Sequence, residues 1–311
     1  MPINTLAYAA MFQKALDKQL VEGATSGWME QNAGQVKYNG GAEVKIPKLS
    51  TSGLADYDRD TGFVQGSATL SYETRSLTQD RARTFMLDAM DVDETNFVAS
   101  AGNVMSDFQR RNVIPEIDAY RYSAIYALLA TAEHVSAAGY TPDESTIFEA
   151  LLADIAAIQD VIGESIPLVI SMSYAAAQKL DLADKISKQL SVADFKQGTI
   201  STKVRSLDGT PIIRVPSARF KTAYEFYDGA TQGQTAGGFV PADDAQSINW
   251  IITARTAPIA VSKTEKIRIF DPDSNQKADA WKLDYRKYHD LWLPDNAIDG
   301  CWANATPLPT P

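Results

Sequence analysis

Three carboxylates lie close together in the sequence, at Asp91, Asp93 and Glu94. Carboxylates that a fold brings together can act as a general acid and a general base. The same residues suit the start of a helix, because Asp93 can cap its first turn and acidic groups favour the positive end of the helix dipole. Salt bridges to Arg81 or Arg83 would explain them as simply. We interpret the group as the beginning of a helix and keep an acid–base site as the alternative.

The segment that begins at Asp271 is similar to the opening of a calcium-binding loop, with oxygen ligands again at Asp273 and Asn275. Such a loop needs glycine at its sixth position and glutamate at its twelfth. Gln276 and Lys282 occupy those positions here. The pattern therefore predicts a turn and not a metal site.

The remaining residues that could do chemistry are few. The chain has two histidines, His134 and His289, and one cysteine, Cys301, so neither a zinc-ligand spacing nor an intramolecular disulfide is available. The dinucleotide fingerprint, the P-loop and the nucleophile elbow are all missing. We predict structural roles for both histidines, no catalytic residue, no metal and no cofactor, and hence a protein that is not an enzyme.

The charge balance narrows the choice of partners. With 29 basic and 39 acidic side chains, the net charge is −10. A phosphate backbone would repel such a surface, which argues against a dedicated nucleic-acid binder and is compatible with the wall of a container. No uncharged apolar run approaches the roughly 20 residues that span a bilayer, and the N-terminus does not resemble a secretory signal. We expect a soluble protein made in a reducing cytoplasm, with no membrane partner.

The feature that says most about function is a polar hairpin between Ala42 and Leu77. Ala42–Leu49 alternates apolar and polar residues, and Ser67–Leu77 is a returning strand rich in Thr, Ser and Tyr. A tip at Ser50–Gly66 joins them. A two-stranded ribbon this polar is marginal alone in water. We expect it to be an arm that lies on a neighbouring subunit, so assembly is the leading functional idea.

Helices and strands are expected in separate blocks around this hairpin. A first helix follows Asn4 or Thr5, and a long helix runs from about Asp93 to Leu129 with an interruption at Pro115, which lacks a backbone donor. A third helix is predicted from the capping box Thr141–Glu144 to Gly163, and a fourth covers Ser173–Leu180. Strands are expected at Ile166–Ser171, Thr210–Pro216, Ile248–Ala254, Ala257–Val261, Glu265–Phe270 and Ala280–Leu293, and an exposed loop at Thr222–Asp244. Because the blocks do not alternate regularly, the fold class is α+β.

Three segments give the chain a resemblance to a known family. They are residues 80–94 (DRARTFMLDAMDVDE), 114–121 (IPEIDAYR) and 281–290 (WKLDYRKYHD). They resemble stretches of the major capsid proteins of tailed bacteriophages, whose shell fold is shared with encapsulins and the herpesvirus capsid floor. The similarity in layout covers almost the whole chain.

The resemblance implies a capsid fold in five segments. These are an N-arm at 1–41, an extended E-loop at 42–79, a P-domain with a long spine helix at 80–136, an A-domain at 137–246, and P-domain return strands with a C-terminal tail at 247–311. In that family the N-arm and E-loop lie across adjacent subunits, which agrees with the unsupported hairpin. The expected product is an icosahedral shell of hexamers and pentamers in the virion, around phage double-stranded DNA that is held without sequence-specific binding.

Partners and contacts follow from the same resemblance. The chain begins a short way before the E-loop, so we expect a separate scaffolding protein in place of the scaffolding segment that many relatives carry. A portal and decoration proteins are further expected partners. An encapsulin-type compartment and an acidic α+β hydrolase or transferase with a site at Asp91–Glu94 are the alternatives. The candidate inter-subunit contacts are charged: Asp58, Arg59, Asp60, Arg75, Arg81, Arg83, Glu116 and Arg121.

Overall fold

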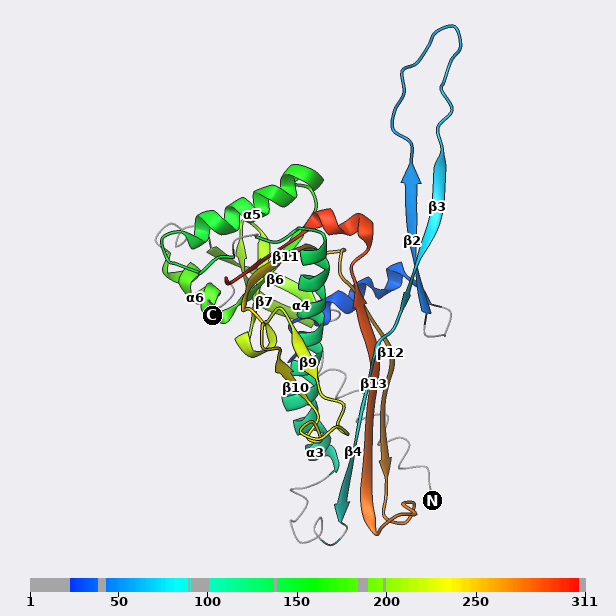
Figure 1. Cartoon of the computed structure of the whole chain (residues 1–311), viewed down its shortest axis with the longest axis vertical. Coiled ribbons are helices and arrows are strands. Elements are labelled where there is room, and N and C mark those ends of the chain that lie inside the picture. The colour runs from blue at the N-terminus through cyan, green and yellow to red at the C-terminus, as the bar shows by residue number, and fades with distance from the viewer. Residues whose placement is uncertain are drawn as a thin grey trace.

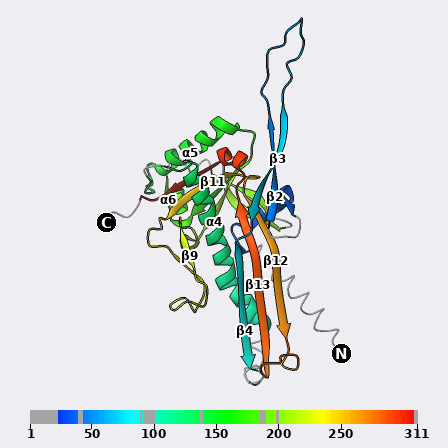
Figure 2. The same ribbon diagram turned by 45° about the vertical axis from the view of Figure 1, so that its right-hand side comes forward.

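The computed structural model describes residues 23–38, 43–88, 90, 101–136, 139–183, 190–197 and 200–307. A body of helices and strands stands beside a long narrow sheet, and a hairpin projects from their junction (Figures 1 and 2). The blocks of helix and strand make the fold α+β, as the sequence predicts. The helix expected after Asn4, the start of the long helix and the group Asp91–Glu94 lie outside the described residues.

The main core surrounds a six-stranded sheet with the order β14-β11-β5-β8-β7-β6. Its strands are β5 (Leu168–Ser173), β6 (Leu190–Gln197), β7 (Ile200–Leu207), β8 (Thr210–Val215), β11 (Ile248–Ala254) and β14 (Cys301–Ala305). β5 and β8 are parallel, and the other neighbours are antiparallel. Every side chain of β5 and β11 is buried, which is typical of strands covered on both faces. Strands β5, β8 and β11 confirm predicted strands, whereas β6, β7 and β14 were not predicted.

Two helices pack against this sheet, α5 (Ile147–Ile162) and α6 (Tyr174–Leu182). The capping box predicted at Thr141–Glu144 is wrong. The Asp143 carboxylate instead accepts hydrogen bonds from the backbone and side chain of Ser145, at 3.0 and 2.6 Å, so a turn precedes the helix. Gly163 ends α5 with a φ of 80°, in the region that favours glycine.

The long sheet has the order β12-β13-β4, with β12 at Ile259–Phe270, β13 at Ala280–Trp292 and β4 at Gln79–Asp88. Two separate strands were predicted where β12 lies. They form one strand because a register shift between Ser262 and Thr264 accommodates the irregularity without ending the pairing with β13.

The long helix is built from α3 (Ala101–Phe108), a π-helical turn η2 (Gln109–Val113) and α4 (Ile114–Thr131). Pro115 cannot donate a backbone hydrogen bond, and the wider turn lies directly before it. The predicted interruption is confirmed in this form. The first turns of α4 pack on the long sheet and its later turns enter the main core, so the helix ties the two together. No helix in the described ranges has both the length and the hydropathy to cross a bilayer.

The hairpin belongs to a three-stranded sheet of β1 (Lys37–Tyr38), β2 (Glu43–Thr51) and β3 (Ala68–Ser76), in that order. The predicted hairpin is confirmed. The segment predicted as an exposed loop contains a small antiparallel pair, β9 (Tyr224–Phe226) and β10 (Phe239–Pro241). Short 3-10 helices lie at η1 (Gly27–Gln35), η3 (Ser217–Arg219) and η4 (Asp295–Gly300).

Candidate assembly surface

The strand register gives the hairpin two different faces. Leu49 pairs with Leu70 and Pro47 pairs with Tyr72, and directly paired residues of antiparallel strands share a face. Leu49 and Leu70 are 66% and 58% exposed, and Tyr72 is 43% exposed. This face therefore carries an apolar strip in contact with solvent.

The opposite face holds the base of the hairpin against its own subunit. Val44 and Ile46 are buried there and pack against Ile259, Val261 and Trp292 of the long sheet. Only the base is covered in this way. On the same face of β2, Lys48 is half-buried and Ser50, nearer the tip, is exposed. One face is thus used within the subunit, and the apolar strip is left for another surface.

A buried carboxylate holds the point where the chain leaves the hairpin. Asp290 accepts hydrogen bonds from the backbone N–H and side chain of Thr78, at 2.8 and 2.9 Å, and from the hydroxyl of Tyr120 at 2.5 Å. Burial and the Asp290 carboxylate raise the pKa of Tyr120 above its usual value. Both strands of the hairpin are therefore fixed at the base, which sets the direction in which it projects.

The tip of the hairpin is an ordered turn although it stands in solvent. Asp58 and Gly62 exchange backbone hydrogen bonds of 3.3 and 2.8 Å, and the Asp60 N–H donates to the Asp58 carboxylate at 2.8 Å. Hydrogen bonds from Asp60 and the next residue hold the pKa of Asp58 below its usual value. The rings of Tyr57 and Phe63 meet edge to face at 5.0 Å, and Phe63 is 91% exposed. The turn presents an aromatic pair beside acidic side chains.

Two of the predicted contact residues pair with each other inside the subunit. Arg81 forms an ion pair of 2.6 Å with Glu116 and donates to two backbone carbonyls of the segment that connects β9 and β10. Arg83 donates to a third carbonyl of that segment at 3.4 Å. These residues hold β4, α4 and the β9–β10 segment together.

Arg75 and Lys48 connect the hairpin to η4. Arg75 pairs with Glu73 on its own strand and lies 3.4 Å from Asp295, and Lys48 lies 3.4 Å from the same carboxylate. All of these groups except Glu73 are substantially exposed, so each pair contributes little to stability. Arg59 and Asp60 stay exposed at the tip with Asp58.

Arg121 does not lie on the surface. Its side chain is fully buried, pairs with Glu30 at 2.5 Å and donates to the carbonyl of Ser26 at 3.2 Å. Burial would raise the pKa of Glu30, but Arg121 and Lys287 outweigh it and hold that pKa below its usual value. This corrects the expectation of a subunit contact: Arg121 fixes the segment before η1 within its own subunit.

The centre of that polar network is Asp118, which was not among the candidate contact residues. This fully buried carboxylate accepts four hydrogen bonds from the backbone and side chains of Thr25 and Ser26, at 2.6 to 3.1 Å, and pairs with Arg219 at 2.9 Å. The signal in the sequence is the spacing of Asp118 and Arg121, which fall on one side of a helix. The sequence does not show which distant segment they bind.

Of the residues considered for chemistry, the structure describes His134, His289, Cys301 and the segment from Asp271. Nδ1 of His134 is 3.2 Å from the carbonyl of Cys301, and His289 is buried on β13. Burial raises the pKa of the Cys301 thiol to about 12. Asp271 accepts a bond from Ser274, which confirms the predicted turn. Within the described part of the chain, no three His, Cys, Asp or Glu side chains are placed to hold a metal ion.

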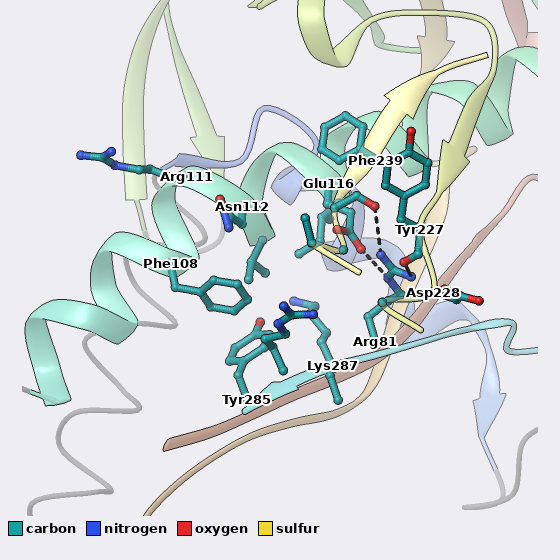
Figure 3. Close-up of a pocket in the computed structure, with 18 of the residues that line it drawn as sticks. Arg81, Phe108, Arg111, Asn112, Glu116, Tyr227, Asp228, Phe239, Tyr285 and Lys287 are labelled. Atoms are coloured by element: carbon teal, nitrogen blue, oxygen red, sulfur yellow. Dashed lines mark hydrogen bonds and ion pairs between the residues drawn. The ribbon is translucent and has the colours of Figure 1, made fainter. Parts of the chain in front are cut away.

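A cleft of about 630 Å³ opens below the hairpin, between β4, the α3–α4 helix and the segment connecting β9 and β10. Figure 3 shows Phe108 and Tyr285 along one side, the Arg81–Glu116 pair on the other, and Arg111 extending outward at the rim. Aromatic, cationic and acidic side chains thus line the same opening. We call it the β4–α4 cleft.

Solved structures with a similar fold come from phages and a virus-like particle. A chain of the mature capsid of bacteriophage PhiM1 is 14% identical, with a TM-score of 0.53, and the match covers 86% of this chain and 82% of that one. A chain from Mycobacterium phage Adephagia is 11% identical, with a TM-score of 0.55 and coverage of 93% and 91%. A virus-like particle from Pyrococcus furiosus matches at 10% identity, with a TM-score of 0.52 and coverage of 96% and 99%. No family model matches the chain, and no curated protein matches it in sequence.

Proposed function

We propose that this chain, which has the capsid fold of tailed phages, is a structural protein that assembles with copies of itself into a closed shell. The fold is the one that the sequence resemblance implied. The neighbours with this fold include a mature capsid and a virus-like particle, which supports a non-enzymatic role.

The observation that carries the proposal is the projecting hairpin with its exposed apolar strip. Beyond the strip, the tip exposes further large apolar side chains: Leu54, Tyr57, Phe63 and Val64. Burying each such side chain contributes about 1.5–3 kcal/mol. In a monomer these side chains stay exposed to solvent and contribute no such stabilisation. A neighbouring copy can bury the strip, and its own hairpin can in turn bind the next copy.

The finer assignments follow the capsid fold. We assign the N-arm to residues 1–41, the E-loop to 42–79, the P-domain to 80–136 and 247–311, and the A-domain to 137–246. Hexamers and pentamers would close an icosahedral shell around phage double-stranded DNA. The net charge of −10 suits a wall that does not bind its contents. A scaffolding protein, a portal and decoration proteins are the partners we propose for assembly in the host cytoplasm.

The match to the Pyrococcus furiosus particle covers nearly all of both chains and supports a second candidate, an encapsulin-type shell with protein cargo. Such shells would be small and would retain a cargo peptide on purification. An acidic enzyme with a site at Asp91–Glu94 would instead give a discrete oligomer and no shells. Size exclusion followed by negative-stain imaging of the purified protein separates the three functions.

The hairpin is tested by two variants. In one, residues Leu54–Gly66 are deleted, and in the other the same segment is replaced by Gly and Ser at equal length. Because the base of the hairpin is packed independently of its tip, both subunits should fold with an unchanged circular dichroism spectrum and fail to form closed particles. The second variant keeps the reach of the arm and isolates the contribution of its side chains. Intact shells from the deletion variant would refute the role of the hairpin tip in assembly, and no particles from the unaltered protein would refute the shell function itself.

A further inference from the structure

We propose that His289 is a pH-sensitive latch at the base of the hairpin. While the imidazole is neutral, the junction of β4, β13 and α4 is closed and the hairpin is held in one direction. When the imidazole takes up a proton, the junction opens and the hairpin is free to move. The inference concerns a single subunit and does not depend on shell formation.

His289 lies where the hairpin joins the body. Strand β3 runs into β4 at this point, and only residues 77–78 separate the two strands (Figure 1). His289 pairs with Gln79, the first residue of β4, and its imidazole meets the ring of Tyr120 on α4 edge to face at 5.7 Å. A change at His289 therefore acts on the first residues that follow the hairpin.

The two neighbours of His289 on β13 hold the residues that leave the hairpin. On one side, Asp290 binds the backbone and side chain of Thr78 and the hydroxyl of Tyr120. On the other side, the hydroxyl of Tyr288 donates to the carbonyl of the residue before Thr78 at 2.9 Å. The imidazole and this clamp share Tyr120 as a neighbour, so a movement of the imidazole disturbs the clamp directly.

The imidazole is buried, and one of its nitrogens has no partner. His289 is 4% exposed, and within the described part of the chain its Nδ1 makes no hydrogen bond. Burial is the largest cause that lowers the pKa of His289 well below 6.5, and the charges of Arg121, Lys287 and Arg81 lower that pKa further. The closed junction therefore excludes the protonated imidazole, which forms only when the junction opens.

The carboxylates near the junction are already bound to other groups. Each of the three neighbouring cations has its own carboxylate at 2.5 to 3.0 Å, in the pairs Arg81–Glu116, Arg121–Glu30 and Lys287–Glu265. Asp80 pairs with Arg286, and Asp228 accepts hydrogen bonds within its own turn. An imidazolium gains a counter-charge only by drawing one of these groups, or Asp290, away from its partner. If it draws Asp290, the clamp on Thr78 is released.

The size of the effect follows from proton linkage. In the open junction the imidazole is exposed to water and has its ordinary pKa of about 6.5. Because only the open form binds the proton, the ratio of open to closed junctions rises about tenfold between pH 7.5 and pH 5.5. Above pH 7.5 the imidazole is neutral in both forms, and the ratio no longer depends on its titration.

Hydrogen–deuterium exchange of the full-length protein tests the latch. The backbone amides of residues 78–81 and 289–291 should be less protected than those of β11, because the junction opens without unfolding of the main core. Their protection, corrected for the intrinsic effect of pH on exchange, should fall about tenfold between pH 7.5 and pH 5.5.

The chain offers a matched pair of variants, because it has only two histidines. His289→Gln keeps a polar side chain that cannot take up a proton, so the fall in protection at the junction should disappear. His134→Gln removes the other histidine, whose Nδ1 lies 3.2 Å from the carbonyl of Cys301 on β14, and the fall should remain.

The unaltered chain can already overturn the latch, so the test does not require that the variants fold. Junction amides that are as protected as those of β11, or whose protection does not change with pH, would overturn it. A fall that persists in His289→Gln, or that disappears in His134→Gln, would do the same. A chain that shows the latch and forms no shells would contradict the proposed function alone.

Discussion

At the scale of single residues, the structure depends on buried charges that link distant segments. Asp118 binds the segment before η1 and Arg219, and Glu30 and Arg121 extend the same network. A buried charge without its partners is costly, so each member depends on the others. These residues are positioned to hold distant segments of the subunit together.

We predict that Asp118→Ala lowers the free energy of unfolding by about 3–5 kcal/mol, because it leaves Arg219 and several buried donors without an acceptor. Urea unfolding of the subunit with the tip deleted measures the effect without interference from assembly. Asp107→Asn, which breaks an exposed ion pair with Arg111, is the control and should cost no more than about 0.5 kcal/mol. Equal losses in the two variants would contradict the role of Asp118.

His289 should make the subunit sensitive to mild acid. Burial, with Arg121, Lys287 and Arg81 nearby, holds its pKa well below 6.5 in the folded chain. Below about pH 6.5 the unfolded chain therefore binds a proton that the folded chain does not, and stability falls as the pH falls. The slope approaches about 1.4 kcal/mol per pH unit.

The measurement is urea unfolding of the tip-deleted subunit between pH 7 and 5, with and without His289→Gln. The variant should lose most of this slope, whatever its stability at pH 7. The depressed pKa of Glu30 acts at more acidic pH, below its ordinary 4.5, and does not overlap this window. An unchanged slope in the variant would show that His289 is not the titrating group.

At the scale of elements, we propose that the hairpin contacts a neighbour through the face that carries the apolar strip. Leu49→Asp places a charge in the apolar strip, whereas Ser50→Asp places the same charge on the opposite face of the same strand. Losing the burial of one leucine costs about 1.5–3 kcal/mol at each interface. We predict at least a tenfold lower particle yield for Leu49→Asp than for Ser50→Asp, measured by sedimentation. Similar yields would show that the strip is not an interface.

The sequence predicted elements wherever local pattern and burial agree. β11 is a mostly apolar run, β13 is rich in aromatic residues, and β2 alternates apolar and polar residues. Prediction from the sequence failed where tertiary contacts decide where a helix or strand begins and ends. Asp143 uses its side chain in a turn and delays the start of α5, and pairing with β13 carries β12 through an irregular point. β14 has only five residues and gains its place by pairing with β11.

At the scale of the whole molecule, the hairpin projects from one side of the body and the β4–α4 cleft opens below it. Sequence reasoning predicted the projecting hairpin, and it proposed a partner surface because a polar ribbon is marginal alone. It could not identify the cleft, whose walls come from four separate segments, residues 80–85, 108–117, 227–240 and 285–289. Contacts between distant segments also explain Arg121. The sequence predicted a surface position, but the segment before η1 covers its side chain.

The central claim is that the hairpin is bound by another copy within a closed shell. Electron cryomicroscopy of the purified, full-length protein tests it most directly. We predict closed particles in which density for residues 49–72 lies against a neighbouring subunit. Single subunits whose hairpin is folded onto their own body would contradict the claim.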